Sequence, residues 1–276
     1  MSSSLRPVVV AVSADGYDAG IRYGAAEAFR GGGPLHVVHV LGLDGGSAAQ
    51  AARICFLAVE RARELVGQQV PVSSEILHGD LIDGLVELSR RARLVVLQRH
   101  GIDAHRDHPR ATSIQVAAHA EVPVVCVPRD WNGRGRGTVT VGVDDVLTCV
   151  PLMREALSAA RSLGARLRIV HVDLPSDECD SERDIRSALV EASAGLEDVA
   201  VTIEVTVGTT PVATLVEAMA TSELLVIGRH HPLIARGSRL GPVARRVVRN
   251  AGCPVLLLTP AASSSSPDWV FAGHLA

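Results

Sequence analysis

The stretch Leu224-Leu-Val-Ile-Gly-Arg-His-His231 decides the fold, because a close copy of it, Leu94-Val-Val-Leu-Gln-Arg-His-Gly101, stands earlier in the same chain. Each copy begins with a run of aliphatic residues, which is typical of a strand buried on both faces. Each run leads into a polar segment that carries an Arg-His pair. A whole supersecondary unit that returns in this way indicates a duplicated domain.

Three further pairs of segments repeat in the same order, at nearly the same spacing. They are Val8–Ser13 with Val139–Asp144, Leu35–Val40 with Leu167–Val172, and Val122–Pro128 with Cys253–Thr259. We therefore expect the 276 residues to form two domains, 1–130 and 138–262. The Gly/Arg-rich segment between them reads as a linker, and the polar segment 263–276 reads as a flexible tail.

Strands and helices alternate within each half. In the second half the pattern predicts strands at about 138–144, 167–172, 201–207, 223–228 and 254–259, and helices at about 149–163, 180–196, 211–221 and 241–251. Such alternation predicts an α/β fold in which each half is a doubly wound, five-stranded parallel sheet flanked by helices. Ligands of such sheets bind beyond the carboxyl ends of the strands, near the switch in strand order.

Composition excludes several classes of function. The net charge of −3 argues against a nucleic-acid partner, and no apolar stretch approaches the roughly 20 residues that span a bilayer. The chain has no lysine, so Schiff-base chemistry and a Walker-type phosphate loop are excluded. Its five cysteines are scattered without a CxxC pair, which favours a cytoplasmic protein with reduced thiols. Cys126 and Cys253 lie in apolar patterns and are expected to be buried.

Three segments of the second half together indicate a family. Val139–Asp144 is a predicted strand that ends in an acid, Leu224–Gly228 is a predicted strand that ends in a glycine, and Arg236–Ala244 leads into a predicted helix. This order resembles the universal stress protein domain, and the similarity extends over nearly all of both halves. The resemblance implies two tandem Rossmann-like (adenine nucleotide alpha hydrolase-like) domains. It also implies ATP or another adenine nucleotide as ligand, with no metal beyond any Mg²⁺ that accompanies ATP.

The nucleotide signature of that family is a Gly, two residues, a second Gly, nine residues, and a Gly followed by Ser or Thr. Glycines let backbone N–H groups approach phosphate oxygens, and the last one opens a helix whose N-terminus favours anions. The acid after the first strand recognises the adenine side of the ligand in members that bind ATP. Carried over to the second half, the resemblance assigns the nucleotide to Asp144, Val172, Gly228, Arg229, His231, Gly241, Pro242 and Val243.

Two of these residues depart from the signature. His231 stands at the second glycine, and Pro242 stands where Ser or Thr is expected. Proline suits the first helical position, but it removes one N–H and one hydroxyl, so we expect an affinity lower by about 10-fold or more. Arg229, Arg236 and Arg239 are candidates for forked phosphate donors, and solvated loop arginines are the alternative interpretation.

The first half departs further from the signature. Ser13 replaces the acid and Gln98 replaces the first glycine, while Gly101 stands at the second. The pair Ala111-Thr112 replaces the last Gly-Ser. We therefore predict that the first half does not bind ATP.

The remaining polar clusters favour neither a metal site nor a catalytic one. His105 and His108, with His100 nearby, have no Cys or Glu beside them, and a solvated loop is the favoured interpretation over a metal site with three or four ligands. His39 and His171 occupy equivalent positions in the second strand of each half, which indicates inherited packing or a ligand-lining role. No nucleophile elbow is present, and the adjacent Asp144 and Asp145 are expected to point apart at a strand end rather than to act as an acid/base pair. The chain is therefore predicted not to be an enzyme.

The leading hypothesis is a cytosolic stress-response module that binds an adenine nucleotide mainly in its second domain and acts through protein partners not yet identified. The alternative is an interaction scaffold that has lost nucleotide binding in both halves. An ATP-hydrolysing or nucleotidyl-transferring enzyme is the third, and fold analogy alone does not support it. The apolar last strands, Val122–Val127 and Pro254–Leu258, are predicted to pair as an intramolecular pseudo-dimer, because exposed apolar edges promote aggregation. A homodimer of whole chains stays open.

Overall fold

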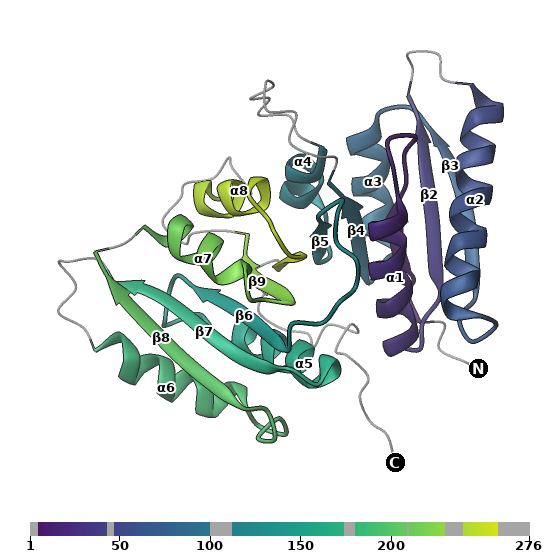
Figure 1. The fold of residues 1–276 in the computed structure, drawn as a ribbon. Coiled ribbons are helices and arrows are strands. Elements are labelled where there is room, and N and C mark those ends of the chain that lie inside the picture. The colour runs from purple at the N-terminus through teal and green to yellow at the C-terminus, as the bar shows by residue number, and fades with distance from the viewer. Residues whose placement is uncertain are drawn as a thin grey trace. The chain divides into compact units, whose positions relative to one another are not determined.

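The computed structural model describes residues 5–42, 47–99, 112–173, 180–208, 210–229 and 240–258. Within it the chain forms two compact units, and the boundary between them falls between Gly133 and Arg134. Each unit repeats the same succession of strands and helices (Figure 1).

The first unit is an α/β domain with parallel strands. Its elements are β1 (Val8–Ala11), α1 (Asp18–Arg30), β2 (Leu35–Leu41), α2 (Ala48–Val66), β3 (Val72–His78), α3 (Leu81–Ser89), β4 (Leu94–Gln98), α4 (Thr112–His119) and β5 (Val124–Val127). The strands lie in the order β3-β2-β1-β4-β5, and each neighbouring pair is parallel. The first strand is therefore central, and the chain winds outward from it in both directions.

The second unit has the same topology. Its elements are β6 (Thr138–Val143), α5 (Val150–Leu163), β7 (Arg166–Asp173), α6 (Ser181–Ala192), β8 (Val201–Val207), α7 (Pro211–Met219), β9 (Leu224–Gly228), α8 (Pro242–Arg249) and β10 (Val255–Leu258). The order is β8-β7-β6-β9-β10, again with parallel neighbours. The predicted α/β class with parallel sheets is thus confirmed.

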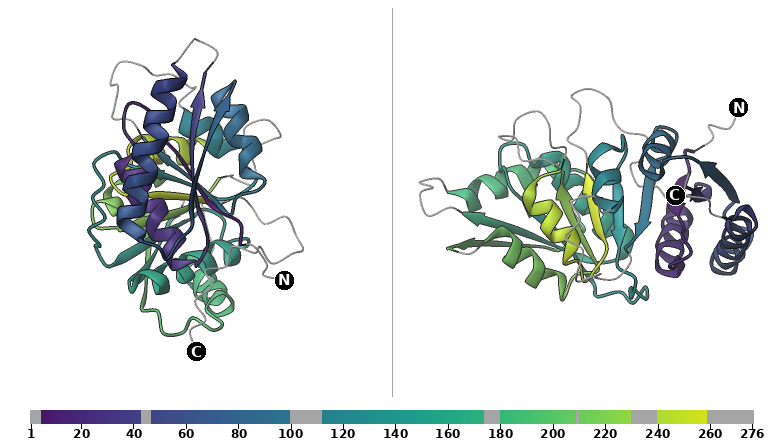
Figure 2. Two further views of the ribbon diagram at one scale, coloured as in Figure 1. Left: turned by 90° about the vertical axis from the view of Figure 1, so that its right-hand side faces the viewer. Right: turned by 90° about the horizontal axis from the view of Figure 1, so that it is seen from above.

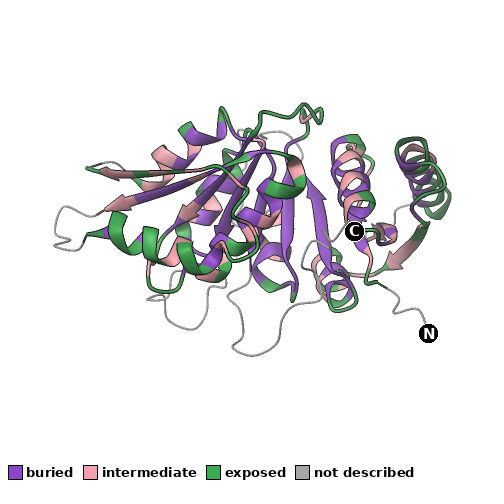
Figure 3. Cartoon of the chain, turned by 90° about the horizontal axis from the view of Figure 1, so that it is seen from below, coloured by how far each residue is buried: buried purple, intermediate pink, exposed green. Residues whose placement is uncertain are grey.

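Helices cover both faces of each sheet (Figure 2). In the first unit α1 and α2 pack together on one face and α3 and α4 on the other, and in the second unit α5 and α6 oppose α7 and α8 in the same way. The central strands are buried along their length, whereas the outer faces of the helices are exposed (Figure 3). The core is aliphatic, as the shortage of aromatic residues requires.

The helix boundaries follow local chemistry. The side chain of Asp80 accepts hydrogen bonds from the N–H groups of Ile82 and Asp83, which caps α3. The end of α6 was predicted near residue 196, but the helix ends at Ala192. Gly195 has a φ of 79° and its N–H donates to Glu197, so the chain turns there in the left-handed conformation that glycine tolerates.

The strand order places the switch point between β1 and β4 in the first unit and between β6 and β9 in the second. A crevice at the carboxyl ends of these strands is the usual ligand position in doubly wound folds. No helix in the described residues is long and apolar enough to cross a membrane.

Candidate nucleotide site of the second unit

Asp144 directly follows β6, at the carboxyl end of the central strand. Asp144 is exposed, whereas the side chain of the next residue, Asp145, is used by the turn that leads into α5. Its carboxylate accepts hydrogen bonds from the N–H of Leu147 and from the hydroxyl of Thr148, both at 2.9 Å. Asp145 therefore shapes the loop, and Asp144 is the exposed residue of the two at the strand end.

Gly228 ends β9, the strand beside β6. The register pairs Ile227 of β9 with Gly142 of β6. Gly228 therefore lies beside Val143, the residue that precedes Asp144. Gly228 is exposed, although the four residues of β9 before it are buried. The strand therefore leaves an uncovered stretch of backbone at the switch point, which is the feature that close approach of a ligand requires.

The N-terminus of α8 is fastened to the end of β9. The N–H of Gly241 donates to the carbonyl of Arg229 at 2.8 Å, and Leu240 beside it is fully buried. The helix begins at Pro242, and its first intrahelical bond runs from the N–H of Arg245 to the carbonyl of Gly241 at 3.0 Å. The Gly241 amide is thus engaged within the protein.

The donors that α8 presents to a ligand are consequently its next amides. Pro242 is exposed and has no N–H. Arg245 is the first residue whose N–H donates to a carbonyl at the start of α8, so the N–H groups of Val243 and Ala244 lie before the first bond of the helix. The partial positive charge of a helix N-terminus favours an anion at this position. The role of Val243 therefore stays a prediction, and it is one that falls to its backbone N–H.

Arg229 lies in the interior. Its side chain is only 2% exposed, and its N–H donates to the carbonyl of Leu258 at 3.0 Å. Its counterpart in the first unit, Arg99, makes the same backbone bond to Val127, and burial lowers the pKa of its guanidinium. The role of Arg229 as a forked phosphate donor stays a prediction. His231, Arg236 and Arg239 lie outside the described residues.

At the end of β7, beside the half-buried Val172, His171 ties two strands together. Its Nδ1 lies 2.9 Å from the carbonyl oxygen of Val143, and its Nε2 lies 3.1 Å from Asp173 Oδ1. His39 makes the same Nδ1 contact, at 2.8 Å, to Val12. The equivalent positions that the repeat indicated thus have equivalent roles, because each imidazole holds the end of the central strand just before the site.

Sequence reasoning missed Asp173 and Ser181. The hydroxyl of Ser181 donates to Asp173 Oδ1 at 2.5 Å, so the same carboxylate oxygen contacts both Ser181 and His171. The two residues come from a strand end and from the first turn of α6. No motif in the sequence connects them, since the first unit has Leu41 where the second has Asp173.

In the first unit a side chain, that of Gln98, stands at the position that corresponds to Gly228. Gln98, at the end of β4, is 8% exposed, and its Oε1 accepts a hydrogen bond from the N–H of Gly20 at 3.0 Å. Ser13 follows the central strand and bridges to Gly16. Thr112 begins α4, while Gly101 and Ala111 lie outside the described residues. The two units thus share a fold but differ at the switch point.

The described residues hold no group of three or more His, Cys, Asp or Glu side chains that would bind a metal ion. His100, His105 and His108 fall outside them. Cys126 and Cys253 are buried, as predicted, and burial raises the pKa of the Cys253 thiol to about 12.

Two doubly wound α/β units with a helix N-terminus at the switch point define a Rossmann-like protein, and known proteins share this arrangement. Residues 135–259 match the sequence model of the universal stress protein family. A universal stress protein of Mycobacterium tuberculosis is 28% identical over 292 residues, which cover 93% of this chain and 99% of that protein. The second unit thus matches the universal stress protein family, and the chain as a whole is similar to universal stress proteins.

The fold is shared with a solved structure, and a second solved structure is similar in sequence over part of the chain. The crystal structure of a universal stress protein from Archaeoglobus fulgidus matches with a TM-score of 0.73 at 16% identity, over 94% of this chain and 100% of that one. A universal stress protein in complex with cAMP is 25% identical, covers 46% of this chain and 100% of its own, and has a TM-score of 0.39.

Proposed function

We propose that this chain is a universal stress protein, a regulatory module that binds an adenine nucleotide, with ATP as the first candidate, in its second unit. The exposed Gly228, at the carboxyl end of β9 and beside the start of α8, is the observation that carries the proposal. The output is conformational and is relayed to protein partners, so the proposal assigns no catalytic residue.

The chemistry of the proposed site is divided between its two sides. The N–H groups of Val243 and Ala244, at the positive end of α8, suit the phosphates. Asp144, at the end of β6, suits a hydrogen-bond donor such as the exocyclic amine of adenine. The backbone at Gly228, which is exposed and carries no side chain of its own, lies between them at the switch point.

The test is a calorimetric titration of the full chain with ATP from micromolar to millimolar concentration, with Asp144→Ala as the site variant. We expect saturable binding of ATP that weakens by about 10-fold or more in Asp144→Ala, because one hydrogen bond to a charged group contributes on this order. Asp184→Ala is the matched control, since Asp184 is an exposed acid on α6.

The outcome separates the candidate functions. Absence of heat and of a thermal shift at millimolar ATP would overturn the proposal and favour the nucleotide-independent scaffold. Release of phosphate or pyrophosphate that disappears in Asp144→Ala would favour an enzyme instead.

A further inference from the structure

Gln98 and Gly228 occupy the same structural position in their units. Each is the last residue of the strand beside the central one. The residue after each is an arginine whose N–H donates to the carbonyl at the end of the unit's last strand, from Arg99 to Val127 at 2.7 Å and from Arg229 to Leu258 at 3.0 Å. A long side chain in one unit therefore replaces an exposed glycine in the other.

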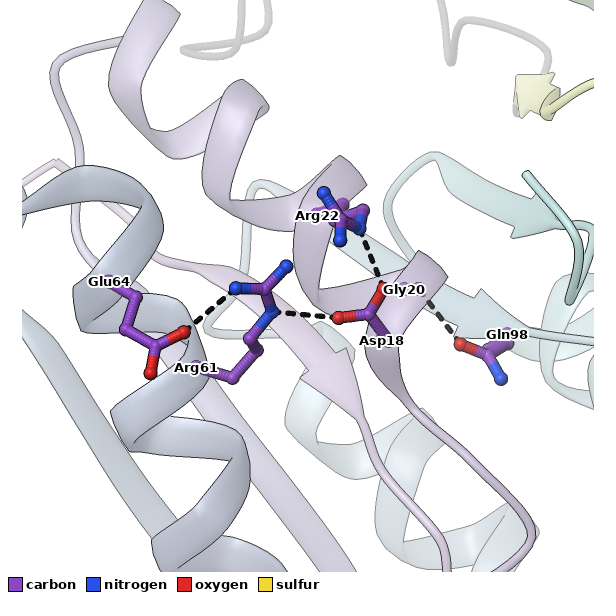
Figure 4. Close-up of polar contacts among 6 residues, drawn as sticks. All are labelled: Asp18, Gly20, Arg22, Arg61, Glu64 and Gln98. Atoms are coloured by element: carbon purple, nitrogen blue, oxygen red, sulfur yellow. Dashed lines mark hydrogen bonds and ion pairs between the residues drawn. The ribbon is translucent and has the colours of Figure 1, made fainter. Parts of the chain in front are cut away.

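The carboxamide of Gln98 is held at the start of α1. This helix begins at Asp18 after Tyr17, whose side chain makes no capping hydrogen bond. The N–H of Gly20, in the first turn, donates instead to Gln98 Oε1 at 3.0 Å, in a buried contact (Figure 4). Gln98 thus accepts from an N–H group that the helix itself leaves without an acceptor.

Two glycines make the room for this side chain. A Cβ at Gly20 would lie 3.3 Å from Gln98 Cβ, and one at Gly16 would lie 3.0 Å from Gln98 Nε2. Gly16 also has a φ of 134°, which side-chain-bearing residues rarely adopt. In the second unit, Thr148 and Leu152 stand at the corresponding places before and within α5. In the first unit the large residue, Gln98, is on the strand and the glycines are at the helix start. In the second unit the glycine, Gly228, is on the strand and the larger residues are at the helix start.

The charges around the start of α1 are already paired. Asp18 contacts Arg22 Nε at 2.6 Å and Arg61 Nε at 2.8 Å, and Arg61 also binds Glu64 (Figure 4). Burial raises the pKa of Asp18, but hydrogen bonds from the two arginines outweigh it and hold that pKa below its usual value. The negative charge beside the helix start is therefore balanced by two guanidinium groups.

We propose that Gln98 is an internal occupant that closes the ligand site of the first unit, so that each chain offers one nucleotide site. The proposal rests on the proposed function for the identity of the ligand. Gln98 is then the residue that decides which unit is open, because its buried side chain fills the strand end that the exposed Gly228 leaves uncovered in the second unit. Shortening this side chain opens the first unit.

The test compares the wild type with Gln98→Gly, each also in the Asp144→Ala background, by equilibrium dialysis of radiolabelled ATP against the full chain. We expect one ATP per chain in the wild type and a second, weaker one in Gln98→Gly. In the Asp144→Ala background, which weakens the site of the second unit, Gln98→Gly should raise the affinity for ATP by about 10-fold, because the first unit then supplies the stronger site.

Gln98→Ala is the second variant, since it keeps a β-carbon in the strand while removing the carboxamide. It carries the test if circular dichroism shows that Gln98→Gly does not fold. A purely structural role of Gln98 predicts a lower melting temperature in both variants and no change in the number of ATP molecules bound.

Two ATP molecules per wild-type chain would overturn the closed site, as would no gain in either folded Gln98 variant. These results are distinct from failure of the proposed function. If the wild type binds no ATP and Gln98→Gly binds one, the nucleotide site of the second unit is wrong and the closed first site stands. If neither protein binds ATP, both proposals are wrong.

Discussion

At the scale of single residues, Glu155 is the side chain least suited to its surroundings. It lies in α5, the helix that packs on β6, β7 and β9, and its Oε2 is buried with no hydrogen-bond partner. Burial raises the pKa of the Glu155 carboxyl to about 8, and the nearby charge of Arg154 only partly opposes this effect. The folded protein therefore favours the protonated acid.

We predict that Glu155→Gln stabilises the protein at alkaline pH and leaves its stability near pH 4.5 unchanged. The pKa in the folded state lies above the value of 4.5 expected on unfolding. The contribution of Glu155 to the free energy of unfolding is therefore fully present below pH 4.5. It is lost at about 1.4 kcal/mol per pH unit as the pH rises from there through about 8. Glutamine keeps the shape without the ionisation.

Thermal unfolding of both proteins at several pH values measures this effect. The difference in melting temperature should grow from near zero at pH 4.5 to a plateau above pH 8. Glu191→Gln, at an exposed position on α6, is the control and should show no such trend. A pH-independent difference for Glu155→Gln would contradict the assignment.

At the scale of elements, the start of α8 is the place where the proposed nucleotide's phosphates would bind. Pro211 in α7 and Pro242 in α8 occupy the first turns of their helices, where proline is favourable because its missing N–H has no intrahelical acceptor. Only α8 begins at the carboxyl end of β9, so only there does the missing N–H concern a ligand.

We predict that Pro242→Ser strengthens ATP binding by about 10-fold, because it adds one N–H and one hydroxyl to the helix N-terminus. Pro211→Ser makes the same exchange at the start of another helix and should leave the affinity unchanged. Calorimetric titration of the two variants and the wild type gives the comparison. An unchanged affinity in a folded Pro242→Ser protein would show that α8 does not contact the phosphates.

At the scale of the whole molecule, the repeat predicts more than the fold of each half. In their own units β5 pairs with β4, and β10 pairs with β9. Alternate amides of a strand point to opposite sides, so half of those in β5 and β10 need another partner or water. The predicted pairing of the two units through these strands would supply that partner.

Residue-resolved hydrogen exchange on the full chain measures this pairing. We expect the amides of β5 and β10 that point away from β4 and β9 to exchange as slowly as those of the central strands. The strands at the opposite edges, β3 and β8, are the internal control, and their outward amides should exchange faster. Rapid exchange at β5 and β10 would contradict the pseudo-dimer.

Much of this molecule was determined by the sequence alone. The aliphatic runs and their return in the same order predicted the parallel α/β units, because burial on both faces demands such runs and duplication preserves them. The pattern also predicted the end of β9 at Gly228 and placed the end of β6 within one residue of Val143. Only the tertiary structure decided that Asp145 serves the turn, that Arg229 is buried and that Gln98 caps α1. Such contacts join segments far apart in the chain, and local patterns do not encode them.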